Sequence, residues 1–181
     1  YRAIDEVTIM CATYYARTSD HGYETCAEHL AMAGCLAGGF AKGFGYLDDG
    51  LLAGLVHDLG KYSDAFQRRI RNPDHCGPVD HSTAGALLLM RYACPLAAMA
   101  VAGHHAGLPD LGSYGELEGP TFMSRMNRAR RAGDCNPLAL AQAGETQLNI
   151  PQPAFLHGTR SAKPTTSGKR SERWSLYTDM M

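Results

Sequence analysis

The sequence contains no long apolar run, almost no net charge and no closely spaced pair of cysteines. A membrane-spanning helix needs about 18 or more consecutive apolar residues, and a signal peptide needs a short apolar stretch behind a positive charge. Neither pattern is found, so we expect a cytoplasmic protein. The formal net charge of -1 excludes a globally basic protein. Contact with nucleic acid would therefore require a local basic patch.

The cysteines also exclude two common classes of site. No C-x-x-C pair occurs, which argues against a zinc ribbon or a redox motif. Secreted domains held together by disulfides are shorter and richer in cysteine. We therefore expect buried, reduced thiols at Cys11, Cys26, Cys35, Cys76, Cys94 and Cys135.

Sustained alternation of apolar and polar residues, the pattern of a half-buried strand, is missing as well. An apolar fraction of 45% over 181 residues suits one domain with its own core. The sequence thus predicts an all-α fold, a compact helical bundle. We expect residues 1–145 to form the core, 146–173 a flexible loop or insertion without periodicity, and 174–181 the start of a truncated helix.

Composition, capping residues and, for the second helix, apolar residues at helical spacing predict the positions of the helices. The expected ranges are 23–40, 50–59, 81–93, 95–107, 121–133 and 136–145. Asp48 and Asp49 are expected to cap the second helix, and Gly60 to end it. Prolines and a glycine make 71–80 a loop, and Asp80 or Ser82 then caps the third helix.

Five histidines and an aspartate occupy four of these predicted helices. They are His29, His57, Asp58, His81, His104 and His105. Imidazole binds Mn, Fe, Co, Ni or Zn, and a carboxylate can bridge two such ions. A lone histidine is more often an ordinary core or surface residue, but packed helices can project several into one site. We expect all six residues to converge on one cleft at helix ends.

Three motifs, in this order and at these separations, resemble a known family. They are "HDLGK" at 57–61, "DHSTAGA" at 80–86 and "GHHAGLPD" at 103–110. With "YYARTSD" at 14–20 and "EHL" at 28–30, they look like the HD-type nuclease domain of the CRISPR-associated helicase-nuclease of type I systems. The resemblance covers about residues 14–131, although the family commonly has a histidine where Arg17 stands. This domain belongs to the wider HD phosphohydrolase superfamily.

The resemblance implies a two-metal nuclease that degrades single-stranded DNA. A superfamily 2 helicase domain, fused or separate, would deliver it after a guide-RNA surveillance complex has opened the target. One ion would be held by His29, His57 and Asp58, and the other by Asp58, His81, His104 and His105. The ions would be two divalent transition metals among Mn, Fe, Co and Ni, with Mg or Zn as further possibilities.

The resemblance also implies that Asp58 acts in catalysis as the bridge and that Lys61 meets the scissile phosphate. The alternative for Lys61 is a solvated cation at a helix C-terminus. Arg125 and Arg128, in a basic helix with Arg130 and Arg131, could line a DNA groove or form a solvated face. Ser82 could contact phosphate or serve as an N-cap.

One family feature has no counterpart in the sequence. The family's last ligand is an aspartate in a late helix reading roughly Ser-x-Leu-x-x-Ala-Asp, and Asp179 stands in a different context. Either the chain is a fragment without this ligand, or its first metal site is incomplete. Two alternatives to the nuclease stay open: a phosphohydrolase of a nucleotide or other small phosphoester, and a catalytically incomplete docking module. An enclosed pocket would favour the small ester, and an open groove would favour DNA.

Overall fold

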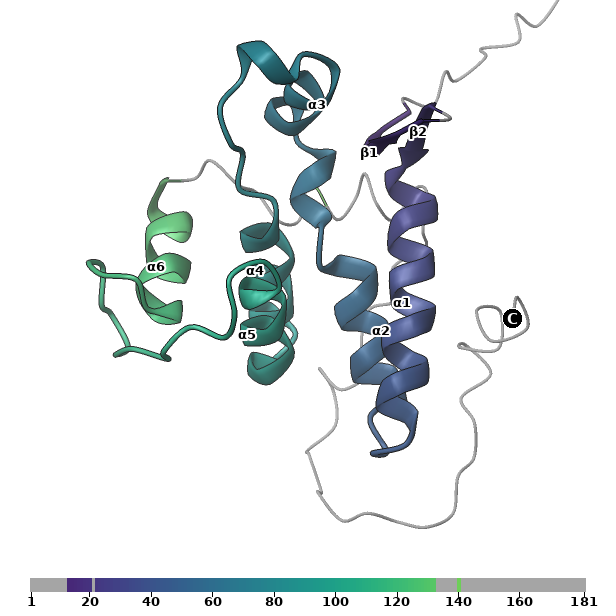
Figure 1. Ribbon diagram of the computed structural model, residues 1–181. Coiled ribbons are helices and arrows are strands. Elements are labelled where there is room, and N and C mark those ends of the chain that lie inside the picture. The colour runs from purple at the N-terminus through teal and green to yellow at the C-terminus, as the bar shows by residue number, and fades with distance from the viewer. Residues whose placement is uncertain (1–12, 21, 133–139, 141–181) are drawn as a thin grey trace, which may run out of the picture.

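The computed structural model describes residues 13–20, 22–132 and 140. Most of this part of the chain is helical, which confirms the all-α prediction (Figure 1). The helices are α1 (Cys26–Lys42), α2 (Leu47–Val56), α3 (Asp64–Arg71), α4 (Ser82–Arg91), α5 (Pro95–Gly103) and α6 (Phe122–Ala132). Two short 3-10 helices, η1 (Leu59–Tyr62) and η2 (Pro73–His75), lie between α2 and α4. The helix predicted at 136–145, the loop at 146–173 and the helix from 174 lie outside the described residues, apart from Leu140.

A small β-hairpin precedes the helices and was not predicted. Strand β1 (Tyr15–Ser19) pairs antiparallel with β2 (Gly22–Thr25). The buried amide of Gln67 holds it in place, accepting from Tyr15 N at 3.1 Å and donating to the carbonyls of Tyr15 and Lys61 at 2.9 and 2.7 Å. Strands of five and four residues are too short to show alternation, and Gln67 lies far along the chain.

Helices α1 and α2 lie side by side (Figure 1). Helix α1 begins at Cys26 rather than at 23, because β2 takes the preceding residues and Thr25 forms a capping box with Glu28. Helix α2 begins at Leu47, so Asp48 and Asp49 lie in its first turn and are not its N-caps. The prediction of these caps was wrong, but the two carboxylates still lie where the helix dipole favours negative charge.

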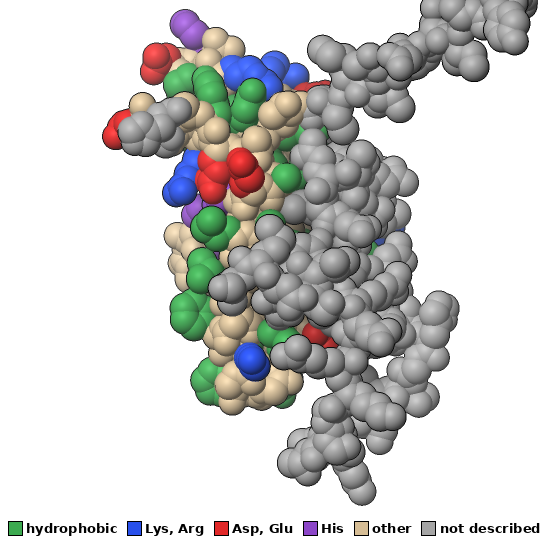
Figure 2. Space-filling model, turned by 90° about the vertical axis from the view of Figure 1, so that its right-hand side faces the viewer, with side chains coloured by type: hydrophobic (Ala, Val, Ile, Leu, Met, Phe, Trp, Pro, Cys, Tyr) green, Lys and Arg blue, Asp and Glu red, His purple; other side chains and the backbone are tan. Residues whose placement is uncertain are grey.

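The two helices approach closely through glycine. A Cβ on Gly54 of α2 would lie 2.4 Å from the carbonyl oxygen of Ala33 in α1. The opposite side of α1 exposes Met32, Leu36 and Phe40. Figure 2 views the molecule from this side and shows hydrophobic side chains at the surface. Helix α1 is therefore buried along one face only.

Helices α4 and α5 form a helical hairpin that packs against α2 and η1. A short turn at 92–94 joins them, so the start of α4 lies beside the end of α5. A Cβ on Gly85 would lie 1.9 Å from the carbonyl oxygen of Val56, the last residue of α2. This close approach brings the hairpin against the end of α2. Helix α6 packs against α4.

Candidate metal centre

The six residues selected from the sequence lie together in the structure. His29 is in the first turns of α1, His57 and Asp58 directly follow α2, His81 directly precedes α4, and His104 and His105 directly follow α5. Their convergence agrees with the prediction, and four segments far apart in the chain supply them. Their roles as metal ligands stay predictions.

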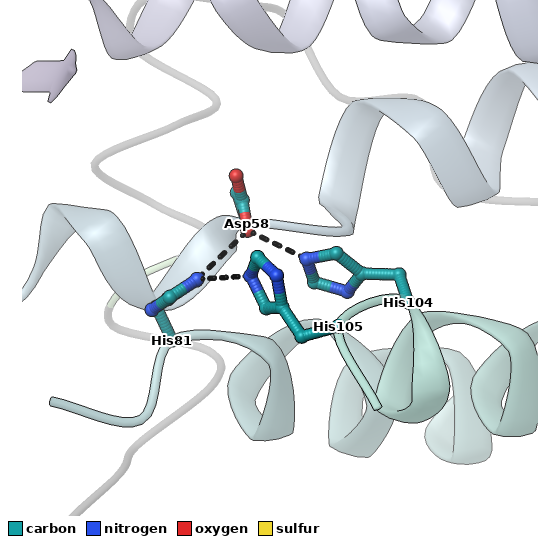
Figure 3. A group of neighbouring side chains, drawn as sticks. All are labelled: Asp58, His81, His104 and His105. Carbon is teal, nitrogen blue, oxygen red and sulfur yellow. Dashed lines mark hydrogen bonds and ion pairs between the residues drawn. The ribbon is translucent and has the colours of Figure 1, made fainter. Parts of the chain in front are cut away.

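Asp58 is the centre of this cluster and is 2% exposed. Its Oδ2 lies 3.0 Å from His29 Nε2 and 3.1 Å from His57 Nε2. Its Oδ1 lies 3.3 Å from His104 Nε2 and 3.5 Å from His81 Nε2. Figure 3 shows His105 on the same side, where its Nε2 lies 2.7 Å from His81 Nε2. The two carboxylate oxygens thus face two different groups of imidazoles.

Local backbone geometry brings Asp58 and His81 together. Helix α2 ends at Val56, and Asp58 has left the helical conformation, with φ -112° and ψ 27°. Gly60 N donates to His81 O at 2.9 Å, and a Cβ on Gly60 would lie 2.5 Å from His81 Cα. Gly60 was predicted to end the helix, but the helix has already ended. Its observed role is to let η1 approach the segment that carries His81.

The orientation of three imidazoles is set by the backbone. Each has Nδ1 within hydrogen-bond distance of a main-chain carbonyl at 2.7–3.0 Å: His57 to Gly54, His104 to Val101 and His81 to Val79. A neutral imidazole that donates from Nδ1 has a lone pair on Nε2. This pattern is common among metal-bound histidines, in which the second nitrogen fixes the tautomer. All three Nε2 atoms face Asp58.

The donor set fits divalent cations. Asp58 Oδ1 is buried without a hydrogen-bond partner among the described residues. Lone pairs of neutral imidazoles directed at a carboxylate repel it, and either a proton on the imidazole or a cation between the two groups removes this repulsion. Two groups have their ligand atoms within 4.8 Å of one another: His29, His57 and Asp58, and Asp58, His81, His104 and His105. Nitrogen donors with a carboxylate suit transition metals rather than calcium.

Electrostatics keep the shared carboxylate ionised. Burial alone would raise the pKa of Asp58, but the imidazoles of His104, His29 and His57 together lower its pKa far below the ordinary value. The contact with Asp58 raises the pKa of His104, against the effect of burial. Burial, together with the neighbouring His104 and His81, lowers the pKa of His105. An ionised carboxylate beside a histidine that favours its neutral form is suited to binding a cation.

Lys61 also contacts the shared carboxylate. Its Nζ lies 2.7 Å from Asp58 Oδ2, and the residue is 9% exposed. The alternative of a solvated cation is therefore not what the structure shows. The ammonium offsets part of the negative charge of Asp58 at the edge of the cluster. The predicted contact with a scissile phosphate stays a prediction.

The three residues expected to contact nucleic acid have partners within the protein. Ser82 is buried at the start of α4, and its Oγ accepts from Arg125 Nη2 at 2.7 Å. The turn before α4 is capped by Asp80, which accepts from the N–H groups of Ser82 and Thr83. Arg128 donates to the carbonyls of Leu117 and Gly119, each at 2.9 Å. Binding of nucleic acid by Ser82, Arg125 and Arg128 stays a prediction.

Two residues near the cluster were not selected from the sequence. Glu24 Oε2 lies 3.4 Å from His29 Nδ1 and pairs with Arg17. The ring of Phe66 packs against His81 with centroids 5.3 Å apart. Each contacts one candidate ligand, His29 for Glu24 and His81 for Phe66, and neither contact was predicted from the sequence. Only the tertiary fold brings Glu24 in β2 and Phe66 in α3 to the site.

Comparison with known proteins agrees with this geometry. The family model described as HD domain matches residues 26–137, a range that includes all six residues of the cluster. No curated protein matches the chain. Among the described residues, no helix has the length and apolar character needed to cross a membrane.

HD domains bind divalent metals and are metal-dependent hydrolases of phosphate esters, which is the chemistry that the donor set suits. The match covers more than half of the chain. The chain therefore belongs to the HD domain family.

Proposed function

We propose that the chain is a metal-dependent nuclease domain that degrades single-stranded DNA in type I CRISPR interference. The observation that carries the proposal is the buried carboxylate of Asp58, which faces one group of histidines with each oxygen. A carboxylate in this position can be shared by two cations. Two-metal sites are typical of enzymes that displace phosphodiester oxygens.

The two groups of neighbouring side chains support the division of ligands that the motif resemblance implies. His29 and His57 with Asp58 would hold one ion, and Asp58 with His81, His104 and His105 would hold the other. When bound, such ions supply a nucleophile from water at neutral pH and offset charge on the attacking and leaving oxygens. The neighbouring imidazoles lower the pKa of Asp58, so its carboxylate is ionised and can attract cations.

Two features of the chain support a polymeric substrate. His104 and His105 are exposed, so the cluster can be approached from the surface. Lys61 places a fixed positive charge next to Asp58, where a phosphate oxygen of the backbone could pair with it. The motifs at 57–61, 80–86 and 103–110 support the choice of single-stranded DNA, a superfamily 2 helicase domain and a guide-RNA complex as substrate and partners.

Cleavage of a labelled single-stranded oligonucleotide tests this proposal. We expect cleavage with Mn²⁺, Co²⁺ or Ni²⁺, none with EDTA, and a loss of at least about 100-fold in Asp58→Asn, since removing a metal centre removes most of the catalysis. Double-stranded DNA and deoxynucleoside monophosphates are the comparison substrates. Turnover of the mononucleotides with inert oligonucleotide would select a small-ester phosphohydrolase instead. Metal binding without any hydrolysis would select a docking module.

A further inference from the structure

The guanidinium of Arg125 joins the two helix ends that carry three of the candidate ligands. Its Nη2 donates to Asp80 Oδ1 and Oδ2 at 2.9 and 3.0 Å and to Ser82 Oγ at 2.7 Å. Its Nε donates to Thr83 Oγ1 at 2.7 Å, and its Nη1 donates to the carbonyl of Ala102 at 2.7 Å. One side chain from α6 therefore bridges the start of α4 and the end of α5.

On the α4 side, these bonds surround His81. Asp80 Oδ1 accepts from the backbone N–H groups of Ser82 and Thr83, each at 3.1 Å. Arg125 supplies the charge that balances Asp80 in this turn. The residues before and after His81 are thus fixed, and its imidazole is fixed in turn by the carbonyl of Val79.

On the α5 side, Arg125 binds the turn directly before His104 and His105. The last carbonyls of a helix have no partner within the helix, and a cation there is favoured by the helix dipole. Ala102 provides one such carbonyl, and the adjacent Val101 provides the carbonyl that accepts from His104 Nδ1 at 2.7 Å. Arg125 therefore holds the segment that sets the direction of the His104 ring.

We propose that Arg125 is a positioning residue that sets how tightly Asp58, His81, His104 and His105 hold a divalent ion. The α4–α5 hairpin is closed at one end by the turn at 92–94, and Arg125 closes the other end. Without it, the ends that hold His81 and His105, now 2.7 Å apart at Nε2, are free to separate. None of the hydrogen bonds of Arg125 in the described part of the chain reaches His29 or His57. The loss of Arg125 should therefore weaken binding of the ion held by the α4 and α5 group and leave binding of the ion near His29 and His57 unchanged.

This inference rests on the proposed metal centre, and Co²⁺ titration of the full chain tests both. His29→Ala isolates the ligand group of α4 and α5, and His105→Ala isolates the group of α1 and α2. In the His29→Ala background we expect Arg125→Gln to weaken the binding of Co²⁺ about 10–100-fold, the range typical for groups that orient ligands. The visible absorption bands of the bound Co²⁺ should change as well. In the His105→Ala background the same change should leave the affinity unaltered.

Two further variants complete the experiment. Arg125→Lys keeps the charge but not the planar fork that spans both helix ends, so we expect an intermediate affinity. Arg130→Gln makes the matched change at an exposed position of the same helix. Its Co²⁺ affinity should equal that of the background protein without this change. Where Arg125→Gln is too unstable to titrate, Asp80→Asn removes the charged acceptor and should weaken the same ion.

The outcomes separate the two proposals. The His29→Ala protein could bind Co²⁺ equally well with and without Arg125→Gln or Asp80→Asn. This result would overturn the positioning role and leave the metal centre intact. Equal weakening in both backgrounds would also overturn it, since Arg125 would then support the whole fold. A wild-type chain that binds no Co²⁺ would overturn the metal centre and the positioning role together.

Discussion

Asp58 is the residue on which both ligand groups depend, because each of its oxygens faces a different group of imidazoles. We expect Asp58→Asn to lose both ions and His105→Ala to lose mainly the ion of its own group. Asparagine has the same shape but lacks the charge that offsets two cations. Metal content after dialysis against Mn²⁺, measured by mass spectrometry, checks both variants. Two retained equivalents in Asp58→Asn would rule out a bridging role.

Cys26 provides a second prediction for a single residue, through its effect on stability. Burial raises the pKa of its thiol from 9.0 to about 12, with smaller effects of Lys61, Asp58 and Glu24. Above pH 9.0 the unfolded chain loses this proton while the folded chain keeps it, so the free energy of unfolding falls as the pH rises. The decrease approaches about 1.4 kcal/mol per pH unit for one group.

Urea unfolding between neutral and alkaline pH, with Cys26→Ala as the comparison, measures this contribution. The variant lacks the thiol, so its free energy of unfolding should decline less steeply with pH than that of the wild type. Groups that titrate in this range without interacting with Cys26 cancel in the difference. Parallel curves for the two proteins would show that the thiol of Cys26 ionises as readily in the folded chain as in the unfolded one.

At the scale of helices, glycine decides how closely the segments that carry the candidate ligands approach each other. A Cβ on Gly85 would meet the carbonyl oxygen of Val56 at 1.9 Å, whereas a Cβ on Gly39 would meet nothing within 4 Å. We expect Gly85→Ala to destabilise the protein by about 3 kcal/mol, the upper end of the usual range for overpacking. Gly39→Ala should stabilise it by roughly 0.5–1 kcal/mol, because alanine favours an exposed helix.

Chemical unfolding of the two glycine variants under the same conditions gives both values. Both variants replace glycine by alanine within a helix. Comparing them therefore separates the steric clash at position 85 from the general preference of helices for alanine. A Gly85→Ala variant as stable as the wild type would mean that α4 can move away from the end of α2 at little cost. The site would then be less tightly packed than the described contacts indicate.

The helices show what the sequence could and could not predict. Composition, apolar spacing and capping signals located α1, α2, α4, α5 and α6 to within a few residues, because these signals depend on residues close together in the chain. The β-hairpin was missed, since it depends on Gln67, a residue more than 40 positions away. The short helix α3, which Ser63 caps, was not identified either.

Within the candidate site, candidate ligands were easier to select than the residues that orient them. Histidine and aspartate carry metal-binding chemistry in the side chain, so motifs point to them as candidates. The roles of Gly60 and Arg125 depend on partners that only the fold brings near, His81 for Gly60 and Asp80 for Arg125. A basic run in the sequence shows charge but not what the charge contacts, and here Arg125 binds its own protein.

At the scale of the whole molecule, the described elements meet at one point. The start of α1, the end of α2, the start of α4 and the end of α5 each contribute side chains, and Arg125 of α6 joins α4 to α5. Backbone carbonyls and closely packed glycines hold the imidazoles of the candidate ligands in place without any ion. Such preorganisation lowers the cost of assembling the site.

The central claim is that one carboxylate joins two cation sites, and anomalous diffraction from crystals grown with Mn²⁺ tests it most directly. The account predicts two anomalous peaks on either side of Asp58, each within roughly 2.3 Å of its ligand atoms. One should lie among Asp58 Oδ2, His29 and His57, and the other among Asp58 Oδ1, His81, His104 and His105. Peaks remote from Asp58, or no peak at this cluster at saturating Mn²⁺, would contradict the account.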